Sequence, residues 1–156
     1  LNHRTATVCV AKGGKSMSRS LLLGILLASL SGCSSVEQRI VSSLFQNYIS
    51  AQEALAADNF DEAKQSLNQL VGEVDGEVKE IAAKAADAKD ISEVRAAFKS
   101  LSAEMAKMEV PEGYVVAFCP MADEGKGATW VQKDEEIANP YFGAEMLRCG
   151  TKQTKN

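Results

Sequence analysis

Apolar residues recur every three or four positions through most of the interval 38–108. This spacing places them along one face of an α-helix, which must then be buried against other elements. Three signals divide or end the pattern. Two are N-cap pairs, Asn59 with Glu62 and Asp90 with Glu93, and the third is a helix stop at Pro111 and Gly113. The sequence therefore predicts four helices, over residues 38–57, 59–74, 78–85 and 91–108. Their short connections favour antiparallel neighbours, as in an up-and-down four-helix bundle.

The pattern changes after the proline. Residues 114–118 and 128–131 are short apolar runs typical of β-strands. We therefore expect a mainly α (α+β) fold, with a helical bundle over residues 39–109 and a small irregular or β C-terminal cap over residues 114–150. Met105 and Met108 continue the apolar stripe of the last helix, so we expect both to fill the core rather than bind a metal.

Charge is distributed unevenly along the chain. Of the 17 Lys and Arg residues, four precede residue 20, whereas all 21 Asp and Glu residues follow residue 36. The part from Ser34 onward therefore carries a formal charge of −8. Nucleic-acid binding needs Lys and Arg to neutralise phosphates, so this acidic body argues against it.

The composition also argues against catalysis. After residue 33 there is no His with which to build a Ser-His-Asp set, and no glycine-rich phosphate loop. The acidic runs at 123–124 and 134–136 are typical of a solvated surface. We therefore expect a binding or interaction protein rather than an enzyme.

The N-terminal segment has the pattern of a secretory signal. Residues 21–30 form a ten-residue apolar run that follows basic residues and precedes small ones. This run is too short to span a bilayer, which takes roughly 20 apolar residues. Met17 opens a compact signal of this kind directly, so we expect residues 1–16 to be a wrongly assigned upstream extension.

The end of the signal resembles the lipobox of bacterial lipoproteins, in the residues Leu30-Ser31-Gly32-Cys33. The resemblance implies that Cys33 receives the lipid and becomes the mature N-terminus. Ser34 after it implies sorting to the outer membrane, with the protein facing the periplasm. The expected organisation is a signal peptide over 1–33, a polar tether over 34–38 and one domain over 39–156.

Four motifs in the tail resemble one family, namely CPM, GATW, NPYFG and ML-x-CG over about residues 118–150. The chain is similar to an uncharacterised periplasmic domain (domain of unknown function 3347). That domain occurs alone in lipoproteins and at the C-terminus of membrane-fusion subunits of copper/silver efflux pumps. The resemblance implies handling of soft metal ions in the cell envelope. Cys-Pro-Met also begins a separate heavy-metal-binding module in which His follows the Met, but here Ala122 stands in that place.

The residue chemistry leaves two interpretations of the tail open. Thiolates and thioethers are soft ligands that select Cu(I), and the candidate ligands are Cys119, Met121, Met146 and Cys149. In an oxidising compartment, a Cys119–Cys149 disulfide is the alternative, and closing a loop of about 30 residues contributes roughly 3–4 kcal/mol. The two states could alternate, since a disulfide cannot ligate Cu(I) as thiolates do.

The expected function follows from the signal and the tail together. We expect a lipid-anchored envelope protein that binds Cu(I) or another soft metal ion, in connection with a metal-efflux system. The alternative is an interaction or scaffold module whose tail is held by the disulfide. Trp130, Tyr141 and Phe142 either pack the tail onto the helices or form an exposed patch for a partner.

Overall fold

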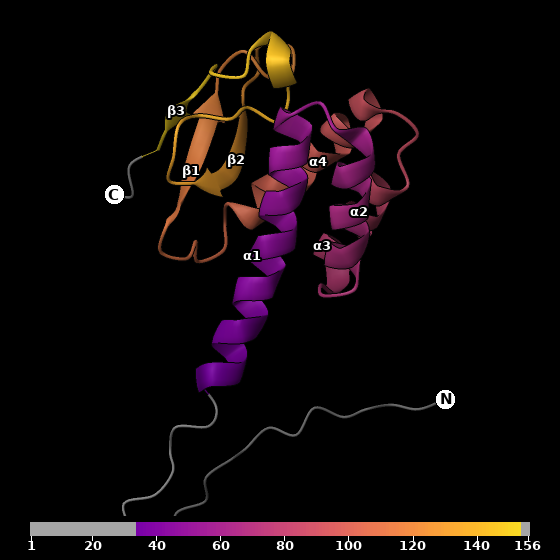
Figure 1. Cartoon of the computed structure of the whole chain (residues 1–156), viewed down its shortest axis with the longest axis vertical. Helices are drawn as coiled ribbons and strands as arrows, with labels where there is room; N and C mark the ends of the chain where they lie inside the picture. The colour runs from indigo at the N-terminus through magenta and orange to yellow at the C-terminus, as the bar shows by residue number, and fades with distance from the viewer. Residues whose placement is uncertain (1–33, 154–156) are drawn as a thin grey trace, which may run out of the picture. The chain divides into compact units, whose positions relative to one another are not determined.

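The computed structural model describes residues 34–153, with side chains from Ser43 onward. Four helices are followed by a small three-stranded sheet (Figure 1). In chain order the elements are α1 (Ser34–Ala56), α2 (Phe60–Val71), α3 (Gly76–Ala86), α4 (Ile91–Met105), β1 (Tyr114–Cys119), β2 (Ala128–Lys133), the 3₁₀ helix η1 (Gly143–Glu145) and β3 (Thr151–Lys152). The predicted fold class, a helical bundle with a small β cap, is confirmed. The predicted signal peptide and Cys33 lie outside the described residues.

The predicted N-caps explain where two of the helices begin. Asn59 Oδ1 accepts a hydrogen bond from the Glu62 N–H at 3.2 Å, and Asp90 Oδ1 accepts one from the Glu93 N–H at 2.9 Å. Each bond satisfies an amide that has no partner within its helix. Helix α1 begins at Ser34, before the start at residue 38 that the apolar spacing predicted.

The end of α4 also differs from the prediction. The helix stops at Met105, which is fully buried, whereas Met108 is 42% exposed. The Met108 N–H bonds to the Met105 carbonyl in a turn after the helix, so Met108 leaves the apolar stripe that its spacing predicted. The assignment of Met108 to the core was therefore wrong, and that of Met105 is confirmed.

The bundle is built from successive antiparallel neighbours, with α1 against α2, α2 against α3, and α3 against α4. The first and last helices meet through aromatic side chains, because Tyr48 of α1 stacks on Phe98 of α4 with ring centroids 5.1 Å apart. None of the helices within residues 34–153 is both long enough and apolar enough to cross a membrane.

The sheet is antiparallel, in the order β2-β1-β3. Strand β2 contacts both α1 and α4, so the sheet packs against these two helices of the bundle (Figure 1). The register pairs Val116 with Val131 and Cys119 with Ala128. Because side chains alternate between the faces of a strand, this register divides the sheet into a helix-facing side and an opposite side.

Candidate functional site

The two faces of the sheet serve two different cores. Val131 belongs to the large core with the helices, and Val116 packs against that core from the neighbouring strand. The opposite face forms a second cluster, which we call the small core, made of Ala117, Cys119, Ala122, Ala128 and Trp130. Cys119 therefore points away from the helices, into a core that the end of the chain must cover.

Residues 137–150, here called the cover segment, close the small core. Asn139 is buried and organises the segment through four hydrogen bonds. Its backbone N–H donates to the Leu147 carbonyl at 2.8 Å, and its side-chain amide donates to the Cys149 carbonyl at 2.7 Å. Its Oδ1 accepts from Tyr141 N–H at 2.8 Å and its carbonyl from Gly143 N–H at 3.2 Å. The cover segment is thus a folded loop with a fixed backbone.

The cover segment brings Cys149 to Cys119. Their sulfur atoms lie 2.9 Å apart, with Cys119 fully buried and Cys149 half-buried. Gly150 makes this approach possible, since a Cβ on it would lie 2.7 Å from the Trp130 ring and 3.0 Å from the Phe118 carbonyl oxygen. The two cysteines that the sequence singled out are therefore brought together in space.

The hydrogen bond with Cys119 raises the pKa of the Cys149 thiol above its usual 9.0, and burial raises it further. The reduced Cys149 thiol therefore holds its proton at neutral pH. A metal ion would have to displace that proton, because thiolates rather than thiols are the ligands. Metal binding through Cys149 would release a proton and strengthen as the pH rises.

The two sulfurs lie within contact distance of each other. This proximity is compatible with a Cys119–Cys149 disulfide, and with two thiolates that share one soft ion.

The two methionines of the predicted ligand set lie nearby in sequence but differ in setting. Met121 is 58% exposed in the turn after β1, and Met146 is half-buried at the end of η1. Within residues 34–153, no three His, Cys, Asp or Glu side chains form a group that could hold a metal. The sulfur donors that the structure clearly joins are thus the two cysteines.

The three predicted aromatic residues line the cover segment and the strand beneath it. Trp130 is fully buried, and its ring meets Tyr141 edge to face with centroids 5.8 Å apart. The Tyr141 hydroxyl donates to the Thr129 carbonyl at 2.5 Å, and burial raises the pKa of this phenol above its usual 10.0. Phe142 is half-buried against the small core. All three side chains contribute to internal packing of the tail.

A glutamine that the sequence reading did not single out orders the approach to the cover segment. Gln132 Oε1 accepts from Trp130 Nε1 at 2.9 Å and from the Ala138 N–H at 3.1 Å. Gln52 of α1 then donates to the Ala138 carbonyl at 2.7 Å, across 86 positions in the chain. Two buried glutamines thereby join α1, β2 and the cover segment. Local periodicity carries no signal for such long-range pairs.

A second missed feature is an ion pair between helices and tail. Arg95 of α4 contacts Asp58 in the α1–α2 turn at 2.5 Å, and Asp58 also accepts from the Ala144 N–H at 2.9 Å. We call Arg95, Asp58 and residues 140–144 the latch. Local sequence patterns carry no signal for the latch, because Arg95 and Asp58 lie 37 positions apart.

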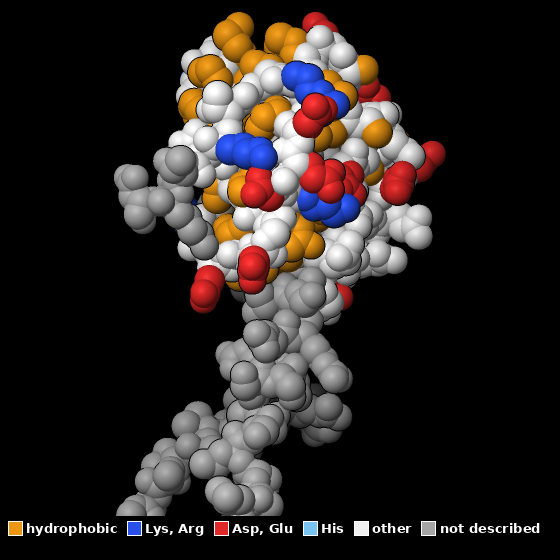
Figure 2. Space-filling view, turned by 60° about the vertical axis from the view of Figure 1, so that its left-hand side comes forward, with side chains coloured by type: hydrophobic (Ala, Val, Ile, Leu, Met, Phe, Trp, Pro, Cys, Tyr) orange, Lys and Arg blue, Asp and Glu red, His pale blue; other side chains and the backbone are white. Residues whose placement is uncertain are grey.

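The outer surface of the cap carries mixed charge. Figure 2 shows basic and acidic side chains lying next to one another on this side, with apolar side chains between them. The exposed pairs include Lys152 with Asp134 at 2.5 Å and Arg148 with Glu136 at 2.9 Å. Exposed pairs of this kind contribute little stability.

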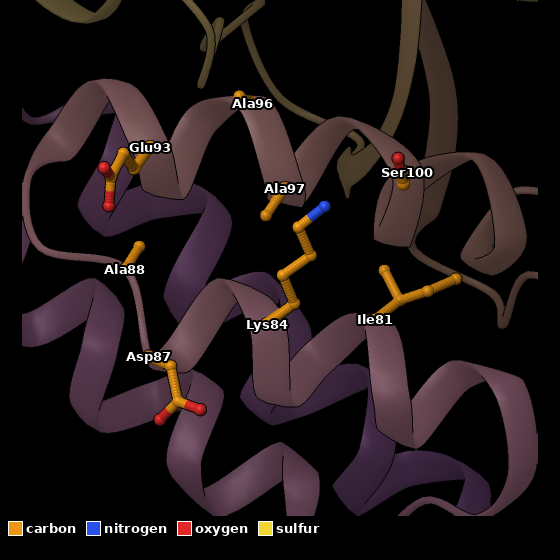
Figure 3. A pocket seen from close by; sticks show the side chains of 8 residues that line it. All are labelled: Ile81, Lys84, Asp87, Ala88, Glu93, Ala96, Ala97 and Ser100. Carbon is orange, nitrogen blue, oxygen red and sulfur yellow. The ribbon is translucent and has the colours of Figure 1, made fainter.

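A groove of about 660 Å³ lies elsewhere, between α3 and α4. Figure 3 shows Lys84 reaching from α3 toward Ala97 of α4, with Asp87 pointing away near the end of the groove. Every buried side-chain nitrogen and oxygen among the described residues has a hydrogen-bond partner. The groove therefore presents no unsatisfied buried group to recognise a ligand, and the cysteine pair remains the candidate site.

Together these features define a helical-bundle domain with a β cap that carries a buried cysteine pair. Residues 44–110 match the model of a family described as "Protein of unknown function (DUF3347)", so the chain contains a domain of unknown function over its helices. This match covers the helices alone, since it ends before β1 and does not include the tail motifs that suggested the resemblance. No curated protein and no solved structure matches the chain.

Proposed function

We propose that this protein is a non-enzymatic envelope protein, lipid-anchored through Cys33, that binds a soft metal ion through Cys119 and Cys149. Cu(I) is the leading candidate because thiolates select it over harder ions. The observation that carries the proposal is the 2.9 Å separation of the two sulfurs, one of which is buried and the other half-buried. In this proposal a metal-efflux component in the same envelope supplies or receives the ion.

The surroundings of the pair support binding more than catalysis. The described part of the chain has no His, and the groups around the sulfurs are apolar or already hydrogen-bonded. The fixed cover segment would hold both ligands near their bound positions, which lowers the cost of ordering them. Met121 and Met146 are the candidate additional ligands, since Met121 follows Cys119 by two positions and Met146 precedes Cys149 by three.

Competition with a Cu(I) chelator tests the proposal on the reduced full chain, with Cys9 and Cys33 changed to Ser. Cys119→Ser and Cys149→Ser should each reduce the affinity for Cu(I) by at least about a hundredfold, as for loss of one of two principal ligands. If both variants hold copper as tightly as the parent, the site assignment is wrong.

The methionines allow a matched comparison. Met121 and Met108 are both exposed, at 58% and 42%, but only Met121 lies beside the pair in sequence. Met121→Leu and Met146→Leu should weaken Cu(I) binding if thioethers complete the site, whereas Met108→Leu should not. Equal effects of Met121→Leu and Met108→Leu would remove Met121 from the ligand set.

A second function is favoured by the hydrogen bonding of the cover segment, which needs no metal. In this proposal the domain is an interaction module, and a Cys119–Cys149 disulfide fixes the tail as a rigid docking surface. The oxidised chain should then unfold with a free energy roughly 3–4 kcal/mol higher than the reduced chain in urea. Equal stability of the two forms would count against the stapled module.

A further inference from the structure

The two sulfurs of the pair are not equivalent. Cys119 lies at the end of the central strand β1 with no exposed surface, among the side chains of the small core. Cys149 lies in the cover segment, is half-buried, and is followed by Gly150, which has no side chain to shield it. A reagent from solution therefore reaches Cys149 first.

We propose that Cys149 is the exchange sulfur of a reversible thiol–disulfide couple and that Cys119 is its buried resolving thiol. This deepens the proposed function and rests on it only in treating the pair as the functional site. The co-reactant is a disulfide or thiol in solution, for which glutathione serves as the probe. The couple would decide whether thiolates are available for a metal ion.

The backbone around Cys149 keeps the pair together in both states. The Cys149 N–H donates to the Met146 carbonyl at 2.9 Å, and its own carbonyl accepts from Asn139 at 2.7 Å. Neither bond depends on the bond between the sulfurs. After reduction the two thiols therefore stay within reach of each other. Closure of the Cys119–Cys149 disulfide is then an intramolecular step with a high effective concentration of the attacking thiol.

Oxidation proceeds in two balanced exchanges. The Cys149 thiol gives its proton to solvent and attacks glutathione disulfide, forming a Cys149–glutathione bond and releasing one glutathione thiolate, which takes up a proton. The Cys119 thiol then loses its proton and attacks Cys149 Sγ, which forms the Cys119–Cys149 bond and expels the second glutathione. Two protein thiols are oxidised while one glutathione disulfide is reduced, and reduction reverses both steps.

The test uses the full chain with Cys9 and Cys33 changed to Ser, without metal. Reduced Cys119→Ser and Cys149→Ser variants are treated with glutathione disulfide, and mixed-disulfide formation is followed by mass spectrometry. Cys119→Ser, which retains Cys149, should react roughly tenfold faster or more, as expected for an accessible over a buried thiol. In urea the two rates should converge.

The parent and a second variant guard against a folding defect. Cys119→Ala places a small apolar group in the apolar small core and should react like Cys119→Ser. In the parent, acid quenching at early times followed by peptide mapping should find glutathione on Cys149. Glutathione found first on Cys119, or a native chain in which both thiols resist exchange, would overturn the proposal. Exchange at Cys149 without copper binding would instead contradict only the metal function.

Discussion

The guanidinium of Arg95 and the carboxylate of Asp58 join three separate parts of the chain. Arg95 Nη2 donates to Asp58 Oδ1 at 2.5 Å and to the Leu55 carbonyl at 2.8 Å, which ties α4 to the end of α1. Its Nε donates to the Pro140 carbonyl at 2.9 Å. The latch therefore fixes the cover segment, and with it Cys149, against the helical bundle.

Replacing the guanidinium should destabilise the fold. Arg95 is 17% exposed, and Arg95→Met removes the side-chain donor from the Leu55 and Pro140 carbonyls and from Asp58 Oδ1. Because the Asp58 side chain is 42% exposed, water compensates part of that loss. We expect the free energy of unfolding in urea to fall by about 2–3 kcal/mol. Lys107→Met, at a 68% exposed ion pair, is the control and should change it little; equal losses would contradict the latch.

The latch also predicts a dependence on pH. The Ala144 N–H and then the Arg95 side chain lower the pKa of Asp58 below its usual 3.8. Such a carboxylate stabilises the folded state above its unfolded pKa, and this contribution is lost as the pH falls through the folded pKa. Stability should therefore decline below about pH 4.

Asp58→Asn should reduce this loss of folding stability at acid pH, which is measured as the free energy of unfolding against pH. Some slope should remain, because a hydrogen bond from Lys99 also lowers the pKa of Asp123. Asp75→Asn is the matched control, since the Asp75 side chain makes no cap hydrogen bond at the start of α3. An unchanged profile in Asp58→Asn would show that Asp58 is not held by the latch.

Gly143 tests how closely the cover segment approaches the latch. Its φ is +57°, and a Cβ there would lie 2.0 Å from Asp58 Oδ1 and 2.4 Å from Arg95 Nη2. Gly125 has φ of +85° but open space around its Cβ position. Gly125→Ala should lower the free energy of unfolding by about 1–2 kcal/mol, because a residue with a Cβ disfavours a positive φ. Gly143→Ala should lower it by about 1–3 kcal/mol more, measured by thermal or urea unfolding, because its Cβ also meets the latch. Equal costs would contradict the close approach.

Tyr48 connects the bundle to the sheet through its hydroxyl. This oxygen lies 2.8 Å from Ser102 Oγ and accepts from the Val131 N–H at 3.1 Å. Burial raises the pKa of this phenol above its usual 10.0, so it stays protonated. Tyr48→Phe leaves a buried amide unsatisfied and should lower the free energy of unfolding by about 1–3 kcal/mol.

Amide exchange at Val131 should also become faster in Tyr48→Phe, because its N–H loses its acceptor. Tyr114→Phe is the matched control, as the Tyr114 hydroxyl makes no hydrogen bond within the described residues. If the Tyr48→Phe chain is as stable as the Tyr114→Phe chain, the Tyr48 hydroxyl does not stabilise the fold.

Local patterns predicted the elements but not how the tail packs. The spacing of apolar residues and the caps at Asn59 and Asp90 located the helices, because these signals act within a few residues. Met108 was misplaced because the helix ended one turn before the pattern did. The strand β3 was not predicted, since two exposed residues carry no apolar alternation.

The composition of the candidate site was predicted in part. Its chemistry identified Cys119 and Cys149, which the structure places 2.9 Å apart. Their environment depends on contacts between residues more than 35 positions apart, such as Arg95 with Asp58 and Tyr48 with Val131. Local periodicity carries no information on these long-range pairs, so it does not indicate on which face of β1 Cys119 lies.

Thiol labelling of the native chain is the direct test of metal binding at the cysteine pair. The full chain, with Cys9 and Cys33 changed to Ser, is reduced and then alkylated with and without buffered Cu(I), and the labelled peptides are mapped. We expect Cys149 to be labelled first without copper, and copper to protect both cysteines of the pair. Labelling of the reduced pair that proceeds equally fast with and without Cu(I) would contradict metal binding at the pair.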